Sequence, residues 1–243
     1  MYQNYVFDLY GTLVDIRTDE SADEFWEKVA KIFLSYGAVY SPKELNSLYR
    51  KYTRRELFST ILSHPNYKSP DIHLEKVFSK LLKHRGVTPT YHKVKDIMWE
   101  FRKASTKFIK LYDGVIDLLD SLKEKGKHIF LLSNAQEYFT VPELKLLGIY
   151  DYFDGILISS QCCCTKPDKH FFNILFDRYN LEKDKTVMIG NDWHYDIEGA
   201  YNFGIDSLYI HQDISSPIDN IKLKSKWSIL DGDVEKIKPL ILR

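Results

Sequence analysis

The chain has few cysteines, and this scarcity excludes two kinds of stabilised fold. Only three cysteines occur, next to one another at positions 162–164. Neighbouring cysteines rarely reach disulfide geometry, and the eight histidines are scattered without a second cluster to complete a zinc site. The sequence therefore favours neither a disulfide-stabilised secreted domain nor a zinc protein.

Net charge and long apolar runs are also lacking. The 34 acidic and 34 basic residues give a formal charge of +0, so no global field holds nucleic acid or an anionic membrane. No apolar run approaches the roughly 18 residues of a membrane span. The first residues enter a strand instead of a charged and then apolar leader. We therefore expect a cytoplasmic protein with no nucleic-acid or membrane partner.

Hydrophobic periodicity divides the chain into two regions. Residues 20–110 show helical spacing of apolar residues, with helix-start signals at 21–24 and 41–44. From residue 111 onward, short apolar strands alternate with helices, and one further strand occupies residues 5–7. This alternation predicts an α/β fold with a mostly parallel sheet and helices on both of its faces. The helical stretch is expected to form a small inserted domain.

Polar side chains follow four of the predicted strands. In chain order they are Asp8 with Thr12, Ser133 with Asn134, Lys166, and Asp192 with Asp196. Each of them alone is compatible with an ordinary turn, a helix cap or a surface position. Ligands of open α/β sheets bind beyond the carboxyl ends of the strands, where all four groups are expected. Together and in this order, they indicate a single site.

Elementary chemistry suggests roles for these groups. The Asp8 carboxylate can attack an electrophilic phosphorus or carbon atom and form a covalent intermediate. Lys166 is a compact cation that can keep Asp8 ionised and offset developing negative charge. Thr12 and Ser133, together with free backbone N–H groups, can bind phosphoryl oxygens. The turn residues Gly11 and Asn134 are expected to line the substrate site.

Several carboxylates against a single lysine predict a bound cation. Two like charges about 4 Å apart at an effective dielectric constant of 20 repel by about 4 kcal/mol. A Mg²⁺ ion held by Asp8 and by acidic groups after the strand at 186–189 removes that repulsion. The spacing allows either Asp192 with Asp196 or Asn191 with Asp196 as its other ligands, and we favour the acidic pair.

The ordered set of motifs resembles the haloacid dehalogenase superfamily of hydrolases. The resemblance is carried by residues 8–12, Ser133, residues 166–168 and residues 190–196. It implies a Rossmann-like core made of residues 1–16 and 111–243, with Asp8 as the covalent nucleophile. It also implies that residues 17–110 form a helical cap that closes over the site.

Tyr10 departs from the pattern of the phosphatases in this superfamily, which usually carry an aspartate two positions after the nucleophile to protonate the leaving alcohol. Tyr10 is a candidate catalytic residue that can donate a proton, but tyrosine, with a pKa near 10, is a poor base near neutral pH. Losing general acid–base help worth about 10²–10⁴-fold raises the barrier by about 3–5 kcal/mol. A halide leaves without a proton, and the first motif is indeed similar to that of the 2-haloacid dehalogenases. By this resemblance, Arg50 would correspond to the arginine with which those enzymes bind the substrate carboxylate.

Two other positions favour phosphoryl chemistry. Those dehalogenases work without metal and carry a serine-rich fourth motif, whereas this chain has an acidic one, and Phe172 stands where they have a tyrosine. We therefore predict Mg²⁺-dependent hydrolysis of a small phosphate ester. Metal-independent dehalogenation is the alternative, and an inactive relative that binds ligands or partners is the third possibility.

Overall fold

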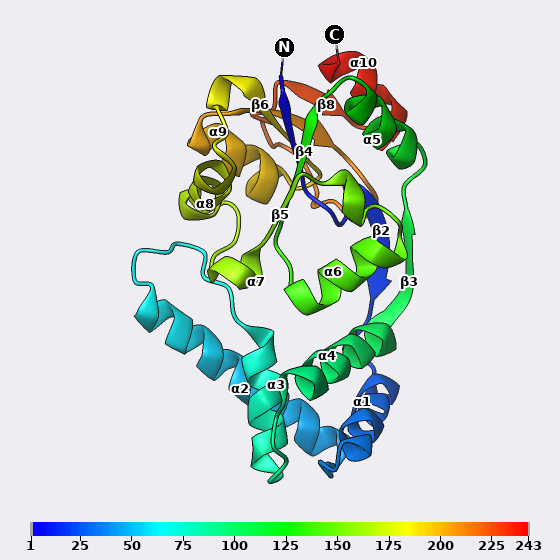
Figure 1. The fold of residues 1–243 in the computed structure, drawn as a ribbon, viewed down its shortest axis with the longest axis vertical. Coiled ribbons are helices and arrows are strands. Elements are labelled where there is room, and N and C mark those ends of the chain that lie inside the picture. The colour runs from blue at the N-terminus through cyan, green and yellow to red at the C-terminus, as the bar shows by residue number, and fades with distance from the viewer. Residues whose placement is uncertain (1, 243) are drawn as a thin grey trace.

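A six-stranded sheet is the centre of the computed structural model, which describes residues 2–242 (Figure 1). Its strands are β1 (Asn4–Phe7), β4 (His128–Ser133), β5 (Gly155–Ile158), β6 (Thr186–Gly190), β7 (Asp206–Ile210) and β8 (Trp227–Ile229). They lie in the order β5-β4-β1-β6-β7-β8, and every neighbouring pair is parallel. In the middle of the sheet, Phe7 is level with Leu131 and with Ile189. The carboxyl ends of the strands therefore meet at one edge.

Helices cover both faces of this sheet, which confirms the predicted fold class. They are α5 (Val115–Glu124), α6 (Glu137–Leu146), α7 (Ser159–Cys162), α8 (Lys169–Tyr179), α9 (Gly199–Phe203) and α10 (Ile237–Ile241). Tyr5 and Phe7 pack in one hydrophobic cluster with α5 and α10, whereas Val6 packs on the other face with α8 and α9. Successive side chains of a strand point to opposite faces, so β1 is buried on both sides.

A two-stranded antiparallel ribbon connects the sheet to the rest of the chain. It consists of β2 (Val14–Thr18) and β3 (Thr106–Leu111), with Val14 level with Leu111. Both strands reach into the stretch 17–110 that was predicted to be helical, so the prediction was wrong at its two ends. The alternation of apolar and polar residues that would indicate a strand is weak in β3, because much of the strand faces solvent. The Phe108 side chain, for example, is 41% exposed.

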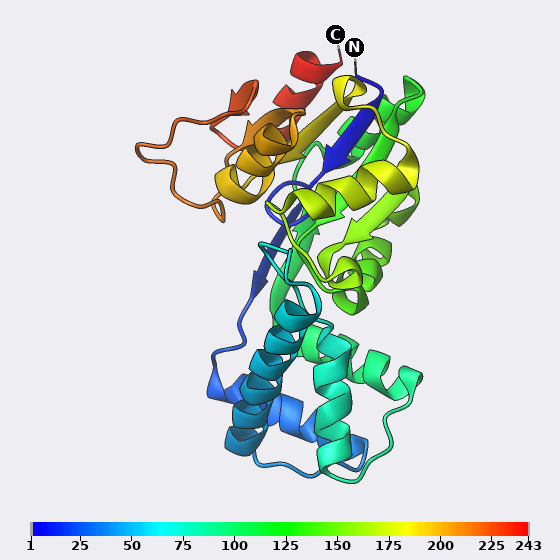
Figure 2. The ribbon, with the colours of Figure 1, turned by 90° about the vertical axis from the view of Figure 1, so that its left-hand side faces the viewer.

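Four helices form a second region beyond the ribbon, which Figure 2 shows below the sheet. They are α1 (Asp23–Ser35), α2 (Pro42–Ser63), α3 (Leu74–His84) and α4 (Tyr91–Ser105). Aromatic rings fill their core, with the Phe101 ring centroid 5.0 Å from that of Phe25 and 5.2 Å from that of Phe78. The predicted start of α2 is present, because Ser41 Oγ accepts a hydrogen bond from the Glu44 N–H at 3.3 Å. No helix within residues 2–242 is long and apolar enough to span a membrane.

The loop between α2 and α3 touches the sheet region beside the predicted site. The Thr165 N–H donates to the Ser69 carbonyl at 2.8 Å, and the Lys68 N–H donates to Asp168 Oδ2 at 2.5 Å. Ser159 Oγ donates to Asp71 Oδ2 at 2.6 Å. The helical region is therefore attached to the sheet region through this loop as well as through the ribbon.

Candidate active site

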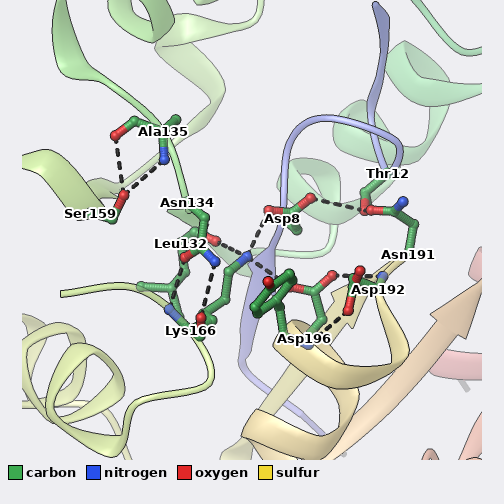
Figure 3. A network of polar contacts seen from close by, with 11 residues as sticks. Asp8, Thr12, Leu132, Asn134, Ala135, Ser159, Lys166, Asn191, Asp192 and Asp196 are labelled. Atoms are coloured by element: carbon green, nitrogen blue, oxygen red, sulfur yellow. Dashed lines mark hydrogen bonds and ion pairs between the residues drawn. The ribbon is translucent and has the colours of Figure 1, made fainter. Parts of the chain in front are cut away.

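The polar side chains predicted from the strand ends lie together at the carboxyl edge of the sheet (Figure 3). Asp8 follows β1, Ser133 ends β4, and Asn191 follows β6. A cavity of about 280 Å³ opens between them. Its lining residues are Asp8, Tyr10, Asn134, Lys166, Asn191, Asp192, Tyr195, Asp196 and Ile214.

Lys166 is the central charge of this cavity. Its Nζ atom lies 2.6 Å from Asp8 Oδ1 and 2.7 Å from Asp196 Oδ1, and it donates to the Leu132 carbonyl at 2.6 Å. The lysine is 1% exposed. Burial alone would lower the pKa of Lys166, but attraction to Asp196 and Asp8 outweighs it and raises the pKa above its ordinary value. The lysine is therefore held as a cation between two carboxylates.

Asp196 is the most deeply buried carboxylate at the site. Burial raises its pKa to about 7, although Lys166 acts in the opposite direction. The side chain fits because Gly190, at the end of β6, has no Cβ; one built there would lie 2.3 Å from Asp196 Oδ2. The Asp192 N–H donates to the same oxygen at 3.0 Å. A small residue at position 190 thus allows Asp196 to reach Lys166.

Thr12 and Asn191 lie on the other side of Asp8. Thr12 Oγ1 is 3.4 Å from Asp8 Oδ2 and 3.2 Å from Asn191 Oδ1. Gly11 has a φ of +84°, and a Cβ there would lie 2.3 Å from Asn191 Nδ2. Only glycine combines this backbone conformation with such a close approach of the amide. The turn after β1 therefore brings Asn191 up against Thr12, which in turn contacts Asp8.

Asp192 is directed differently from its neighbour. Its Oδ1 accepts hydrogen bonds from the N–H groups of His194 and Tyr195, both at 2.8 Å, at the start of the π-helical turn η3 (Trp193–Glu198). Its Oδ2 accepts from Ser216 Oγ at 3.2 Å. Asp192 lines the cavity, but both of its oxygens serve local structure. Of the two alternatives left open by the spacing, the geometry brings Asn191 rather than Asp192 into contact with Thr12, the neighbour of Asp8.

Asn134 lines the cavity at the end of β4, and Ser133 lies directly before it, outside the lining. The Ser133 hydroxyl is buried and has no hydrogen-bond partner among the described residues. Asn134 brackets Lys166, since its Oδ1 accepts from the Lys166 N–H at 2.8 Å and its Nδ2 donates to the Lys166 carbonyl at 3.1 Å. Asn134 thus fixes the backbone that carries the lysine, and the unpartnered Ser133 hydroxyl can donate to an anionic ligand.

Tyr10 enters a buried polar cluster that the sequence did not reveal. Its hydroxyl donates to Glu143 Oε2 and lies 3.0 Å from Thr140 Oγ1. Arg102, from α4, donates through Nε to Glu143 Oε1 at 2.6 Å. One signal was available: Glu143 is a charged residue four positions after Phe139, on the buried side of α6. Burial, followed by the Glu143 charge, raises the pKa of Tyr10 above its ordinary value.

Arg50 is not brought to the cavity. It lies on the exposed side of α2, and its Nε donates to Asn46 Oδ1 at 2.8 Å. Phe172 is fully buried in the core on the α8 side of the sheet. Neither residue lines the cavity, so the chemistry of the site rests on the groups around Lys166.

The chain has a parallel α/β sheet, and the ends of its strands hold carboxylates, hydroxyls and a buried lysine. This combination is the one expected from the resemblance to the haloacid dehalogenase superfamily. The sequence model of haloacid dehalogenase-like hydrolases matches residues 5–210, and the chain belongs to that family.

Comparisons with individual proteins agree with this assignment. Glyceraldehyde 3-phosphate phosphatase of Methanothermobacter thermautotrophicus is 24% identical over 153 residues, which cover 63% of this chain and 63% of that protein. The chain spans about half the length of the curated relatives that it matches.

Solved structures share the fold along the whole chain. The 2-haloacid dehalogenase of Pseudomonas syringae pv. Tomato superimposes with a TM-score of 0.69 at 18% identity, covering 100% of this chain and 99% of that one. The HAD-hydrolase YfnB of Bacillus subtilis, described as bound to magnesium, gives a TM-score of 0.56 at 19% identity, covering 100% and 99%. At these identities the likeness concerns the fold alone.

Proposed function

We propose that the chain hydrolyses a small phosphorylated molecule by transferring its phosphoryl group to Asp8. The observation that carries the proposal is the position of Lys166, buried between Asp8 and Asp196 at the mouth of a cavity. One Asp8 oxygen is held by the lysine, and the other lies toward Thr12. A carboxylate held in this way is fixed in position, as a nucleophile requires.

The proposed reaction has two steps. In the first step, an Asp8 oxygen attacks phosphorus and the bond to the leaving group breaks, which gives an aspartyl phosphate. In the second step, water attacks that phosphorus and frees Asp8. Lys166 lies beside the reacting oxygen, where it offsets negative charge. The Ser133 hydroxyl, which has no partner among the described residues, is available as a donor to a phosphoryl oxygen, whereas the Thr12 hydroxyl faces Asp8 and Asn191.

The donor set fits a Mg²⁺ ion. Asp8 and Asp196 carry two negative charges against the single charge of Lys166, and Asn191 adds an amide oxygen; all three are hard oxygen ligands. No group of three Asp, Glu, His or Cys side chains suited to a metal occurs within residues 2–242. Asn191 would therefore complete the set in place of the predicted Asp192. Bound there, Mg²⁺ would neutralise the phosphoryl group and the carboxylates.

We propose that the helices α1–α4 act as a cap over the cavity. Arg102 of α4 reaches Glu143 of the sheet region, and Glu143 in turn accepts from Tyr10 at the cavity wall. The cap is thus connected to the residue two positions after the nucleophile candidate. The boundaries of this cap fall inside the strands β2 and β3, which form its stem.

The central test uses Asp8→Asn with Asp15→Asn as a matched control. Both aspartates are 8% exposed, but Asp15 pairs with Arg17 on β2, outside the cavity. With 4-nitrophenyl phosphate as the probe, Asp8→Asn abolishes phosphate release and Asp15→Asn retains it. EDTA removes the activity of the unmodified chain, and Mg²⁺ restores it. Turnover that survives Asp8→Asn would refute the nucleophile, and turnover that survives EDTA would refute the metal.

Tyr10 favours a second candidate, hydrolytic dehalogenation. Its hydroxyl is bound by Glu143, and a halide needs no proton to leave. Release of chloride from 2-chloropropionate in EDTA, lost in Asp8→Asn, would establish this activity. The absence of chloride release under conditions where 4-nitrophenyl phosphate is hydrolysed would exclude it.

A further inference from the structure

Tyr10 lines the cavity two positions after Asp8, yet the proton of its hydroxyl is already engaged. Its hydroxyl donates to Glu143, and Thr140 Oγ1 lies 3.0 Å away. Thr140 is fully buried and Glu143 is 2% exposed. A phenol has a single proton, so protonating a substrate oxygen would require Tyr10 to abandon a buried carboxylate.

Glu143 cannot supply the proton instead. Arg102 donates to both of its oxygens, through Nε at 2.6 Å and through Nη2 at 3.4 Å. The Arg102 guanidinium also lies over the Tyr10 ring, 5.5 Å from its centroid. This two-point pairing engages both Glu143 oxygens as acceptors. Within the cluster of Tyr10, Glu143, Thr140 and Arg102, the Tyr10 hydroxyl proton and both Glu143 oxygens are therefore engaged.

The other charged groups around the cavity are also engaged. Lys166 Nζ has three protons and contacts three acceptors, namely Asp8, Asp196 and the Leu132 carbonyl. Asp192 accepts from the start of η3 and from Ser216. Neither group stands where an aspartate two positions after Asp8 would stand. The three protons of Lys166 are therefore matched by acceptors within the protein.

We propose that this site acts on phosphorylated substrates whose leaving group departs as a stable anion: acyl phosphates, phosphoric anhydrides and aryl or enol phosphates, in preference to alkyl phosphates. The inference rests on the proposed function. As Asp8 attacks, the bond between phosphorus and the leaving oxygen breaks, and its electron pair remains on that oxygen as a carboxylate, phosphate or phenolate. Water then attacks the aspartyl phosphate, its proton is carried away by the phosphate product, and Asp8 is regenerated as a carboxylate.

The test is a series of aryl phosphates that differ only in the substituent opposite the phosphate, from nitro to methyl. Because kcat/KM covers the step in which the phenolate leaves, it reports directly on the need for a proton. General acid catalysis contributes about 10²–10⁴-fold, so we expect kcat/KM to be about 100-fold lower for 4-methylphenyl than for 4-nitrophenyl phosphate. A difference of less than about tenfold overturns the inference.

Two variants examine the role of Tyr10 itself. Tyr10→Phe removes the hydroxyl and should leave the ratio between the two substrates unchanged; a ratio that rises by about 100-fold would identify Tyr10 as the acid and refute the proposal. Tyr10→Asp introduces a carboxyl group that can hold a proton, and it should raise kcat/KM for 4-methylphenyl phosphate more than for 4-nitrophenyl phosphate.

Failure of the inference and failure of the proposed function give different results. If no aryl phosphate is hydrolysed faster by the unmodified chain than by Asp8→Asn, the phosphatase function itself is wrong, and the inference falls with it. If hydrolysis depends on Asp8 but the series is flat, the phosphatase function stands and only the preference for the leaving group is refuted.

Discussion

Replacing Lys166 by methionine tests the electrostatic core of the site. The substitution keeps an unbranched side chain of similar length but removes the positive charge between Asp8 and Asp196. Asp8 Oδ1 lies 2.6 Å from Lys166 Nζ, and Asp196 Oδ1 lies 2.7 Å from the same atom, so the two carboxylate oxygens are close to each other. Both carboxylates are nearly buried, at 8% and 1% exposure. Without the lysine, two like charges are left facing each other in the protein interior.

The magnitude follows from two independent estimates. At an effective dielectric constant of 20 and a separation of about 5 Å, two carboxylates repel by about 3 kcal/mol. Removing one partner of a buried ion pair typically costs about 3–5 kcal/mol. Since the free energy of unfolding of a domain is about 5–15 kcal/mol, Lys166→Met should be strongly destabilised. For a chain of this size, the loss corresponds to a decrease in Tm of roughly 6–20 °C.

The dependence on pH separates this electrostatic effect from simple loss of packing. In the folded protein, burial holds the pKa of Asp196 at about 7, above that of an unfolded aspartate, so the folded state binds the extra proton. Stability therefore decreases as pH rises from the pKa of an unfolded aspartate to the pKa of about 7 that Asp196 has in the folded protein. The decrease should be steeper without Lys166, because the lysine lowers the pKa of Asp196. Lys166→Met should recover much of its lost stability between pH 8 and pH 5.

Urea denaturation in EDTA at these two pH values is the appropriate measurement, because a bound metal would replace the missing charge. Lys224→Met is the control, since Lys224 is a half-exposed lysine that pairs with Glu198 on the surface. It should leave the denaturation midpoint unchanged. A Lys166→Met variant that is destabilised equally at pH 8 and pH 5, or by less than about 1 kcal/mol at pH 8, would contradict the electrostatic reasoning.

Three further outcomes are expected. Glu143→Ala leaves Arg102 buried without its carboxylate and should lower the free energy of unfolding by about 3–5 kcal/mol in urea titration, whereas a loss below about 1 kcal/mol would show that the pair is dispensable. Gly11→Ala places a Cβ against Asn191 on a backbone with a φ of +84°. It should lower the free energy of unfolding by about 1–3 kcal/mol and reduce the hydrolysis of 4-nitrophenyl phosphate; unchanged hydrolysis would argue against the tight turn. Burial raises the pKa of Cys164 to about 12, so this thiol should resist a disulfide reagent at pH 8 until the protein is unfolded, and labelling of Cys164 in the native protein would disprove its burial.

The parts of the site that depend on strand ends were predictable from the sequence. Asp8 and Ser133 follow apolar runs buried on both faces, and parallel pairing brings the ends of such runs to one edge. β3 was not predictable in the same way. Its exposed residues give little periodicity, and the strand exists because β2, about ninety positions earlier in the chain, pairs with it.

The choice between Asn191 and Asp192 shows where spacing alone is insufficient. The two residues are adjacent and both precede Asp196 at a suitable distance, so a preference for the more acidic residue was reasonable. The backbone then decides: Asp192 turns back to cap η3, while Asn191 faces Thr12 in the space left by Gly11. Such a decision depends on side-chain directions after β6, which no pattern of residue types encodes.

The nucleophile candidate and the residue two positions after it are held by different parts of the fold. The sheet supplies Asp8 and Lys166 through the ends of strands and loops, and these positions are fixed by backbone pairing within the core. In the proposed reaction, the departure of the leaving group depends instead on residue 10, whose side chain has its partners outside the sheet. Here its partners are Glu143 of α6 and, through it, Arg102 of α4. A change at any of these three positions would alter proton supply without disturbing the nucleophile, which makes this cluster the place where substrate preference can diverge.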